Sequence, residues 1–141
     1  MRTRFLPLRS AFLGAFLAIS CAAPAPYHLP AEGALGPYSA AVGSGEFVFF
    51  SGKIGKTGGT IGQDVDAAID ALVKDLGRMN LTLADVVSVN VYVTDIGGYA
   101  DLNLAYAKRF PQPFPARTTV AVTALPGGAK VEIQAVAARR R

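Results

Sequence analysis

Cysteine and histidine are almost missing from this chain of 141 residues, which contains one of each, Cys21 and His28. Catalytic arrangements of the Ser-His-Asp or Cys-His type need a histidine beside the nucleophile, and structural zinc sites are built from clusters of cysteine and histidine. The sequence therefore excludes an internal disulfide and argues against a cysteine nucleophile or a metal site in its main part. Its chemistry must come from Arg, Glu, Tyr, Ser, Asn, backbone groups and water.

A basic surface is also missing once the two ends of the chain are set aside. The formal net charge is +4. Without Arg2, Arg4 and Arg9 it falls by three to +1, and the terminal run 139–141 supplies three further positive charges. The body of the chain is thus slightly acidic. This excludes an extended nucleic-acid face, and we expect no nucleic-acid partner.

The N-terminus has the pattern of an export signal. Arginines precede an apolar run at 11–19, and small residues follow it. The run is too short to span a bilayer comfortably, so the pattern predicts a signal peptide over residues 1–20. An organelle transit peptide would also have a basic start, but it would lack this distinct apolar block.

The sequence Leu17-Ala18-Ile19-Ser20-Cys21 resembles a bacterial lipobox, which predicts lipidation of Cys21. Ordinary cleavage after Ala23 or Ala25 is the alternative and would remove this cysteine. We therefore expect an exported protein that is periplasmic or anchored to the membrane only through its N-terminal lipid. The Ala- and Pro-rich segment 21–35 is predicted to be a tether, and residues 36–141 a single domain.

Hydrophobic periodicity and turn residues predict the order ββαβαββ. The run Phe47–Phe50 is apolar on both faces and predicts a buried central strand, and the Pro126-Gly127-Gly128 turn predicts a C-terminal hairpin. The predicted strands are 38–42, 46–51, 86–94, 118–123 and 129–138, and the predicted helices are 64–79 and 98–110.

This order predicts an α+β fold in which both helices pack on one face of a mixed sheet. In the strand 86–94, valines alternate with polar residues, which predicts two different environments: Val87, Val89, Val91 and Val93 on one face, and Ser88, Asn90, Tyr92 and Thr94 on the other. The face without helices must meet solvent or another subunit. An oligomer that buries this face is the simpler expectation.

Arg117 is the first candidate for a functional residue. It opens a predicted strand, and a guanidinium on a strand is a rigid fork that suits a carboxylate. Glu132 is the single acidic residue in the apolar run that follows the turn. It is either a carboxylate in a cleft or a solvent-facing residue of an alternating strand.

Several short motifs resemble the reactive intermediate deaminase family, also called the YjgF/RidA or L-PSP family. The resemblance covers nearly everything from Gly36 to Arg139. It implies a chorismate-mutase-like fold and a homotrimer with three sites in the clefts between subunits. It also implies cofactor-independent hydrolysis of 2-imino acids and their enamine tautomers to 2-oxo acids and ammonia. The motifs are Gly36-Pro37-Tyr38-Ser39, Phe49-Phe50-Ser51-Gly52, Val91-Tyr92-Val93-Thr94-Asp95, Asn103 with Tyr106, Phe114-Pro115-Ala116-Arg117 and Val131-Glu132-Ile133.

By the same resemblance, Arg117 is expected to bind the substrate carboxylate, and Glu132 and Ser51 are expected to line the same cleft. The chemistry of these residues then predicts that water is oriented by Glu132, or by Ser51 and backbone groups. The other residues expected to line the cleft are Tyr38, Gly52 and Asn103. Each has a structural alternative. Tyr38 could only pack the seam between subunits, Ser51 could cap a loop, and Asn103 could make local hydrogen bonds.

The chain also departs from the family pattern, since Lys53 stands where glutamine is usual and Ala68 replaces a polar residue. Substrate preference therefore stays open. A non-catalytic trimer that binds small carboxylates is the second hypothesis. RNA cleavage, suggested by an older name of the family, is disfavoured because the chain offers neither a basic face nor a catalytic histidine.

Overall fold

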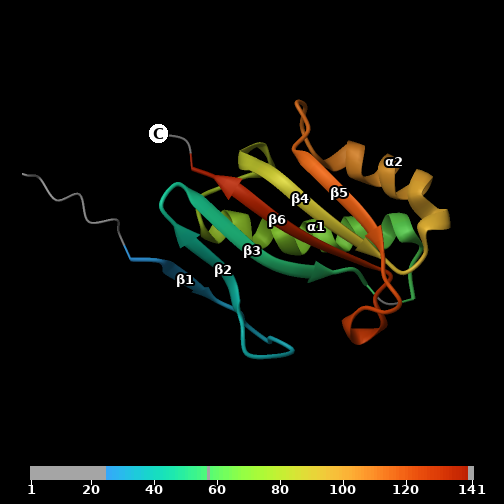
Figure 1. Ribbon diagram of the computed structural model, residues 1–141, viewed down its shortest axis with the longest axis horizontal. Coiled ribbons are helices and arrows are strands. Elements are labelled where there is room, and N and C mark those ends of the chain that lie inside the picture. The colour runs from blue at the N-terminus through green and yellow to red at the C-terminus, as the bar shows by residue number, and fades with distance from the viewer. Residues whose placement is uncertain (1–24, 57, 140–141) are drawn as a thin grey trace, which may run out of the picture.

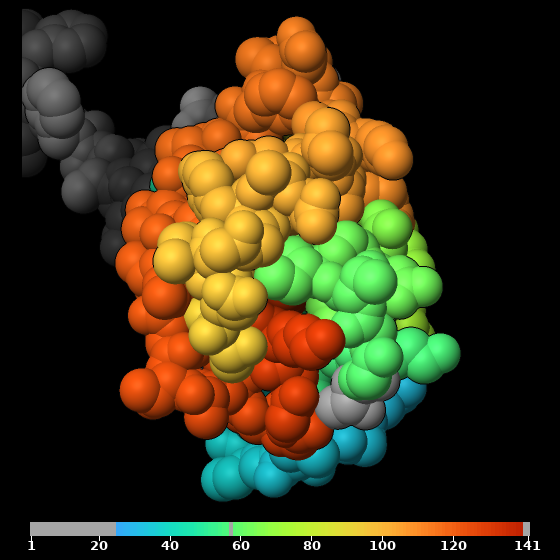
Figure 2. Space-filling model, turned by 90° about the vertical axis from the view of Figure 1, so that its right-hand side faces the viewer, coloured from blue at the N-terminus to red at the C-terminus, as the bar shows by residue number. Residues whose placement is uncertain are grey.

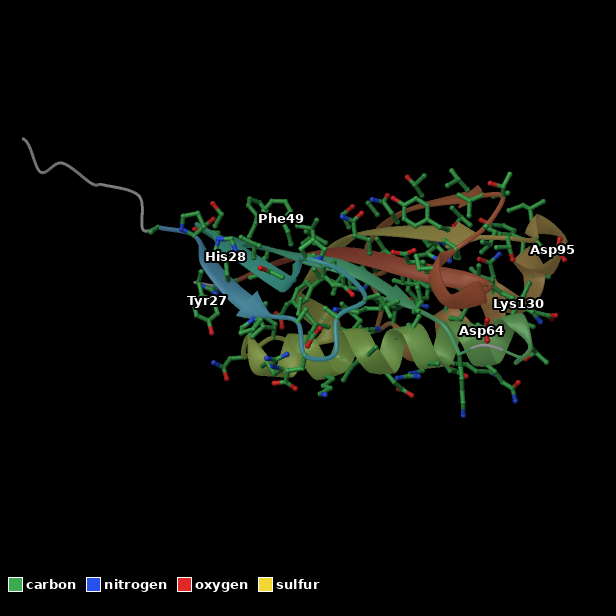
Figure 3. The ribbon with its side chains drawn as sticks, turned by 90° about the horizontal axis from the view of Figure 1, so that it is seen from below. Tyr27, His28, Phe49, Asp64, Asp95 and Lys130 are labelled. Atoms are coloured by element: carbon green, nitrogen blue, oxygen red, sulfur yellow. The ribbon has the colours of Figure 1, made fainter. Side chains whose placement is uncertain are left out.

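Six strands form one sheet and two α-helices cover one of its faces in residues 25–56 and 58–139, the part of the chain that the computed structural model describes (Figure 1). Seen from below, α1 lies under the sheet, and the opposite face carries no helix (Figure 3). This confirms the predicted α+β arrangement. The strands are β1 (Tyr27–Pro30), β2 (Ser39–Ser44), β3 (Phe47–Ile54), β4 (Val86–Val93), β5 (Ala116–Ala121) and β6 (Val131–Ala138); the helices are α1 (Ile61–Arg78) and α2 (Tyr99–Arg109), with short 3-10 turns at Leu83–Asp85, Ile96–Gly98 and Pro126–Gly128.

Helix α1 forms the main contact with the sheet. It begins three residues earlier than predicted because Thr60 and Gln63 form a capping box, in which each side chain accepts a hydrogen bond from the other's backbone N–H. It ends where Asn80 adopts the left-handed conformation, with φ of 57°. The apolar residues that recur at three- and four-residue spacing along the helix form one stripe, which is buried over its whole length: Val65, Ile69, Leu72, Leu76 and Met79.

The C-terminal hairpin prediction is wrong. The strand order is β1-β2-β3-β6-β4-β5, so β6 lies between β3 and β4, and β5 pairs in parallel with β4. Parallel neighbours need a crossover connection, and α2 provides it. The turn at Pro126–Gly128 therefore starts a path across the sheet to β6, with positive φ at Gly127 and Gly128.

The predicted tether contains a strand. Tyr27–Pro30 forms β1, which pairs antiparallel with β2 and buries Leu29 in the core. The element order is therefore βββαβαββ, with one strand more than predicted. A four-residue strand with a single buried side chain has too little alternation to be recognised in an Ala- and Pro-rich stretch. The predicted signal peptide and Cys21 lie outside the described residues.

The helix-free face of the sheet is partly apolar. β3 is central, as predicted, but only Val48 and Phe50 point to the core, while Phe47 and Phe49 are 47% and 48% exposed. Val87 is exposed too, contrary to the predicted alternation, because the pairing with β6 shifts between Val86 and Ser88 and Val86 takes the inward position. We call this surface the open face.

Candidate functional site

Arg117 lies on the edge strand β5 and points toward α2. Its Nη2 donates hydrogen bonds to Oδ1 of Asn103 at 2.6 Å and to the hydroxyl of Tyr99 at 3.2 Å. Its guanidinium carbon also lies 4.6 Å from the centre of the Tyr106 ring, within the range of a cation–π contact. A guanidinium has five N–H donors. Three of them, on Nη1 and Nε, have no partner in the described chain, so the group is oriented and still able to bind a ligand.

These residues border a cavity of about 730 Å³, which we call the arginine pocket. Its walls are mainly apolar and aromatic, and they include Ile96 and Phe114. Two buried polar atoms on its lining, the hydroxyls of Tyr106 and Thr119, have no hydrogen-bond partner among the described residues. A cavity with one fixed cation and free hydroxyls is suited to a small carboxylate with an apolar side chain.

Tyr106 cannot supply a base to this pocket near neutral pH. Burial raises the pKa of its phenol to about 12, and the nearby positive charge of Arg117 only partly offsets this effect. The ring stacks on Phe110, with 4.2 Å between ring centres. Tyr106 therefore remains a neutral phenol that supports the guanidinium of Arg117.

Glu132, Ser51 and Gly52 meet in a second pocket of about 380 Å³, the glutamate pocket. The carboxylate of Glu132 lies directly over Gly52, where an added Cβ would be 2.7 Å from Cδ of Glu132. Glycine at position 52 is thus required for this close approach. Within the described chain the Glu132 side chain has no hydrogen-bond or ion-pair partner, and it is only partly buried.

Ser51 has a structural bond of its own. Its hydroxyl donates to the carbonyl oxygen of Ser39 at 2.7 Å and so ties β3 to β2. Tyr38, just before β2, is 48% exposed and borders a third pocket beside Gly52. Ser51 thus has a structural bond between strands rather than the loop cap considered above, and it also borders the glutamate pocket.

Within one chain the predicted site residues form two separate groups, one around Arg117 and Asn103 and one around Glu132, Ser51 and Gly52. Arg117 lies on the helix-covered side, where it bonds to α2. Glu132 alternates with the buried Val131 and Ile133 and so faces the open side. One chain therefore places these two residues on opposite sides of the sheet. Figure 2 views the end of the molecule where the start of α1 (green), the segment before α2 (yellow) and the turn before β6 (red) meet.

Tyr99, Tyr106 and Thr119 were not among the predicted site residues. The helical spacing of Tyr99, Asn103 and Tyr106, at four and then three residues, places them on one face of α2 and is the signal that could have found two of them. Thr119 follows Arg117 at the strand period of two, which places both on one face of β5.

No three His, Cys, Asp or Glu side chains among residues 25–56 and 58–139 lie together in a group that could hold a metal ion. None of the helices in the same ranges has the length and hydropathy needed to cross a bilayer.

Comparison with known proteins gives consistent matches. The sequence matches the family described as "Endoribonuclease L-PSP" over residues 29–139. It is 36% identical over 114 residues to "Reactive Intermediate Deaminase A, chloroplastic" of Arabidopsis thaliana, a match that covers 76% of this chain and 61% of that protein, less than two thirds of the relative. It is 33% identical over 109 residues to "2-iminobutanoate/2-iminopropanoate deaminase" of Dermatophagoides farinae, covering 72% of this chain and 85% of that protein. The crystal structure of RidA from an Antarctic Psychrobacter superposes with a TM-score of 0.72 at 32% identity, over 79% of this chain and 94% of that one.

Proposed function

Because this chain belongs to the Endoribonuclease L-PSP (YjgF/RidA) family, we propose that it is a cofactor-independent deaminase that hydrolyses 2-imino acids and their enamine tautomers to 2-oxo acids and ammonia. The observation that carries this proposal is the guanidinium of Arg117. It is held by Asn103, Tyr99 and the ring of Tyr106 at the wall of the arginine pocket, with three N–H donors left for a ligand. Relatives that bear deaminase names support the same reaction.

The proposed reaction depends mainly on correct positioning of the imino acid. A 2-imino acid has a planar carboxylate next to an electrophilic C=N carbon, so binding of the carboxylate by Arg117 fixes that carbon as well. Water adds to the carbon while the imine nitrogen takes up a proton. The resulting amino alcohol then loses ammonia as its hydroxyl becomes the carbonyl of the 2-oxo acid. One water is consumed, and no covalent nucleophile is required.

The water needs a base, and Glu132 is the proposed one. Tyr106 stays protonated beside Arg117 because its pKa is raised to about 12, whereas Glu132 has an unpaired carboxylate in the glutamate pocket. Ser51 would help to orient the water, and Tyr38 and Gly52 would complete the wall.

Assembly of the site requires a second copy of the chain, and we propose the homotrimer that the family resemblance implies. Arg117 and Glu132 face opposite sides of one protomer, so a shared cleft can form only where the arginine pocket of one copy meets the glutamate pocket of the next. The half-exposed phenylalanines of the open face support this assembly, because apolar surface of this kind is typical of an interface.

An amino-acid oxidase that generates imino acid in the presence of semicarbazide tests the proposal. Wild-type protein should reduce the rate of semicarbazone formation by hydrolysing the imine first. Arg117→Ala should lose this effect at least a hundredfold, and Arg117→Lys, which keeps the charge without the planar fork, should fall between the two. Equal competition by wild type and Arg117→Ala would refute the role of Arg117.

A trimeric protein that binds small carboxylates without turnover is the second candidate. The observation in its favour is that the arginine pocket of one chain contains a cation and neutral hydroxyls but no carboxylate base. Binding of a 2-oxo acid to both wild type and Glu132→Gln with equal affinity, without imine hydrolysis by either, would support this candidate over the deaminase.

We also propose that the protein acts outside the cytoplasm, as its signal-like N-terminus predicts. Mass spectrometry of the N-terminal peptide from cells tests this. A lipid-modified Cys21, or a mature chain beginning after Ala23 or Ala25, would support export, and an intact N-terminus in the cytoplasmic fraction would contradict it.

A further inference from the structure

A cluster of ionic side chains lies behind the glutamate pocket, on the helix-covered side of the sheet. Nζ of Lys53 is 2.6 Å from Oδ2 of Asp75 on α1, and these side chains are only 11% and 10% exposed. Nη1 of Arg78 is 3.1 Å from the other carboxylate oxygen of Asp75. Nη2 of Arg78 also donates to the carbonyl oxygen of Pro30 at 3.2 Å and to Glu32 at 3.5 Å. We call these four charged side chains the ionic cluster.

The Lys53–Asp75 pair anchors β3 just after a bulge. Phe50 pairs with Ala135 and Lys53 pairs with Ile133, so β3 has one residue more than β6 between these two points. Because strand side chains alternate, Phe50 and Lys53 would face opposite sides of a regular strand, but with the extra residue both face α1. The bulge contains Ser51 and Gly52, and it is where the carboxylate of Glu132 approaches the backbone.

The same cluster also restrains the segment that leads to Tyr38. Arg78 joins α1 to Pro30 at the end of β1 and to Glu32 in the following turn. A pocket of about 410 Å³ lies between this segment and α1, and it is bordered by Tyr38, Gly52 and Lys53. The ionic cluster thus ties to α1 the backbone segments that carry three proposed site residues, Tyr38, Ser51 and Gly52.

A contribution to folding stability is a weak explanation for a buried ion pair of this kind. Two charges buried together lose much of their attraction to the cost of desolvation, and apolar replacements of similar volume are often neutral or stabilising. The pair instead specifies the register of β3, because the ammonium of Lys53 must meet a carboxylate at one position on α1. A one-residue slip of β3 against β6 would turn Lys53 to the open face and break this contact.

We propose that Lys53 and Asp75 are positioning residues: their buried ion pair fixes the register of the bulge that presents Ser51 and Gly52 to the glutamate pocket. This inference rests on the proposed function where it concerns turnover. Its structural part, the register of the bulge, stands independently of any reaction.

The test is the double variant Lys53→Met with Asp75→Leu, which replaces the pair by apolar side chains. Arg78 loses its contact with Asp75 in this variant, but it is 27% exposed and keeps its bonds to Pro30 and Glu32. We expect it to melt at or above the wild-type temperature. Its KM for imino acid should rise at least tenfold, with a smaller change in kcat. Amide hydrogen exchange at residues 51–54 should become at least tenfold faster. Arg109→Gln is the control, because it breaks the ion pairs from α2 to Asp66 and Asp70 of α1, which include no residue of the ionic cluster or the bulge, and it should leave KM and this exchange unchanged.

The two readouts separate the two claims. Wild-type KM together with wild-type exchange at 51–54 in the double variant would overturn the inference while leaving the deaminase intact. Faster exchange in a protein whose wild type shows no imine hydrolysis would support the positioning role and refute the proposed function. A double variant in which KM rises but exchange at 51–54 stays at the wild-type rate would also overturn the inference, because the register of the bulge would then not depend on the pair.

Discussion

Removal of the Tyr106 hydroxyl directly tests the buried, unpaired environment that this group has in the arginine pocket. It is buried and has no hydrogen-bond partner among the described residues, and its pKa is raised to about 12. Tyr106→Phe removes only this hydroxyl and keeps the ring that stacks on Phe110 and lies beneath Arg117. At pH 8 we expect the variant to be more stable by on the order of 1 kcal/mol, because an unpaired buried hydroxyl costs about that much or more.

The pH dependence of the unfolding free energy gives a second, independent prediction for this variant. The unfolded chain releases the phenol proton near pH 10, whereas the folded chain keeps it until about pH 12. Between these values the unfolded state binds fewer protons, so the free energy of unfolding of the wild type falls as pH rises. At pH 11 this loss amounts to about 1 kcal/mol, and Tyr106→Phe should lack it.

Urea unfolding at fixed protein concentration, at pH 8 and at steps up to pH 11, measures both effects. The difference in unfolding free energy between the variant and the wild type should widen with pH. Tyr27→Phe, at a tyrosine that is 56% exposed, controls for loss of a surface hydroxyl and should have no effect at pH 8. Two parallel curves for wild type and Tyr106→Phe would refute the raised pKa, and a less stable variant at pH 8 would show that the hydroxyl is satisfied.

Three further changes test other parts of the structure. Gly52→Ala places a Cβ against the carboxylate of Glu132 and displaces this flexible side chain, so it should lower imine hydrolysis at least tenfold with little change in urea unfolding; full activity would mean that Glu132 is not needed where it lies. Asn80→Ala forces an alanine into φ of 57° and should cost about 1 kcal/mol, whereas Asn80→Gly should not; equal losses would contradict the left-handed cap. Phe49→Glu places a charge on the open face and should convert the proposed trimer to monomers in sedimentation velocity; an unchanged sedimentation coefficient would remove this position from the proposed interface.

In the proposed deaminase, the placement of Arg117 and Glu132 on opposite sides of the sheet predicts that a monomer is a poor catalyst. Asn103 and Tyr99 complete the environment of Arg117 from α2, within a few ångströms and within one chain. Glu132 is held on the far side by the alternation of β6. Catalysis would thus depend on assembly, and the protein concentration at which trimers form should limit activity.

Local patterns were sufficient for much of the fold. The stripe on α1 is buried as its periodicity predicts, and Asn80 has the left-handed conformation expected at a helix end. Both depend on neighbours within one turn of helix, which a linear sequence contains. Local patterns could not predict β1, nor that β6 pairs with β3 and β4 instead of forming a hairpin with β5. Strand pairing is decided by contacts between distant segments, and the Pro-Gly-Gly turn suits a hairpin as well as a longer crossing.

The sequence by itself determined which chemistry is available. With one cysteine and one histidine, both before residue 29, it left Arg117 and Glu132 as the principal charged candidates, and its motifs placed the chain in its family. The tertiary structure alone decided where these groups point. The direction of a strand side chain depends on register, bulges and which face the helices cover, and these are set by the whole sheet. Arg117 thus joins α2, Glu132 lies over Gly52 on the open side, and Lys53 reaches back to Asp75.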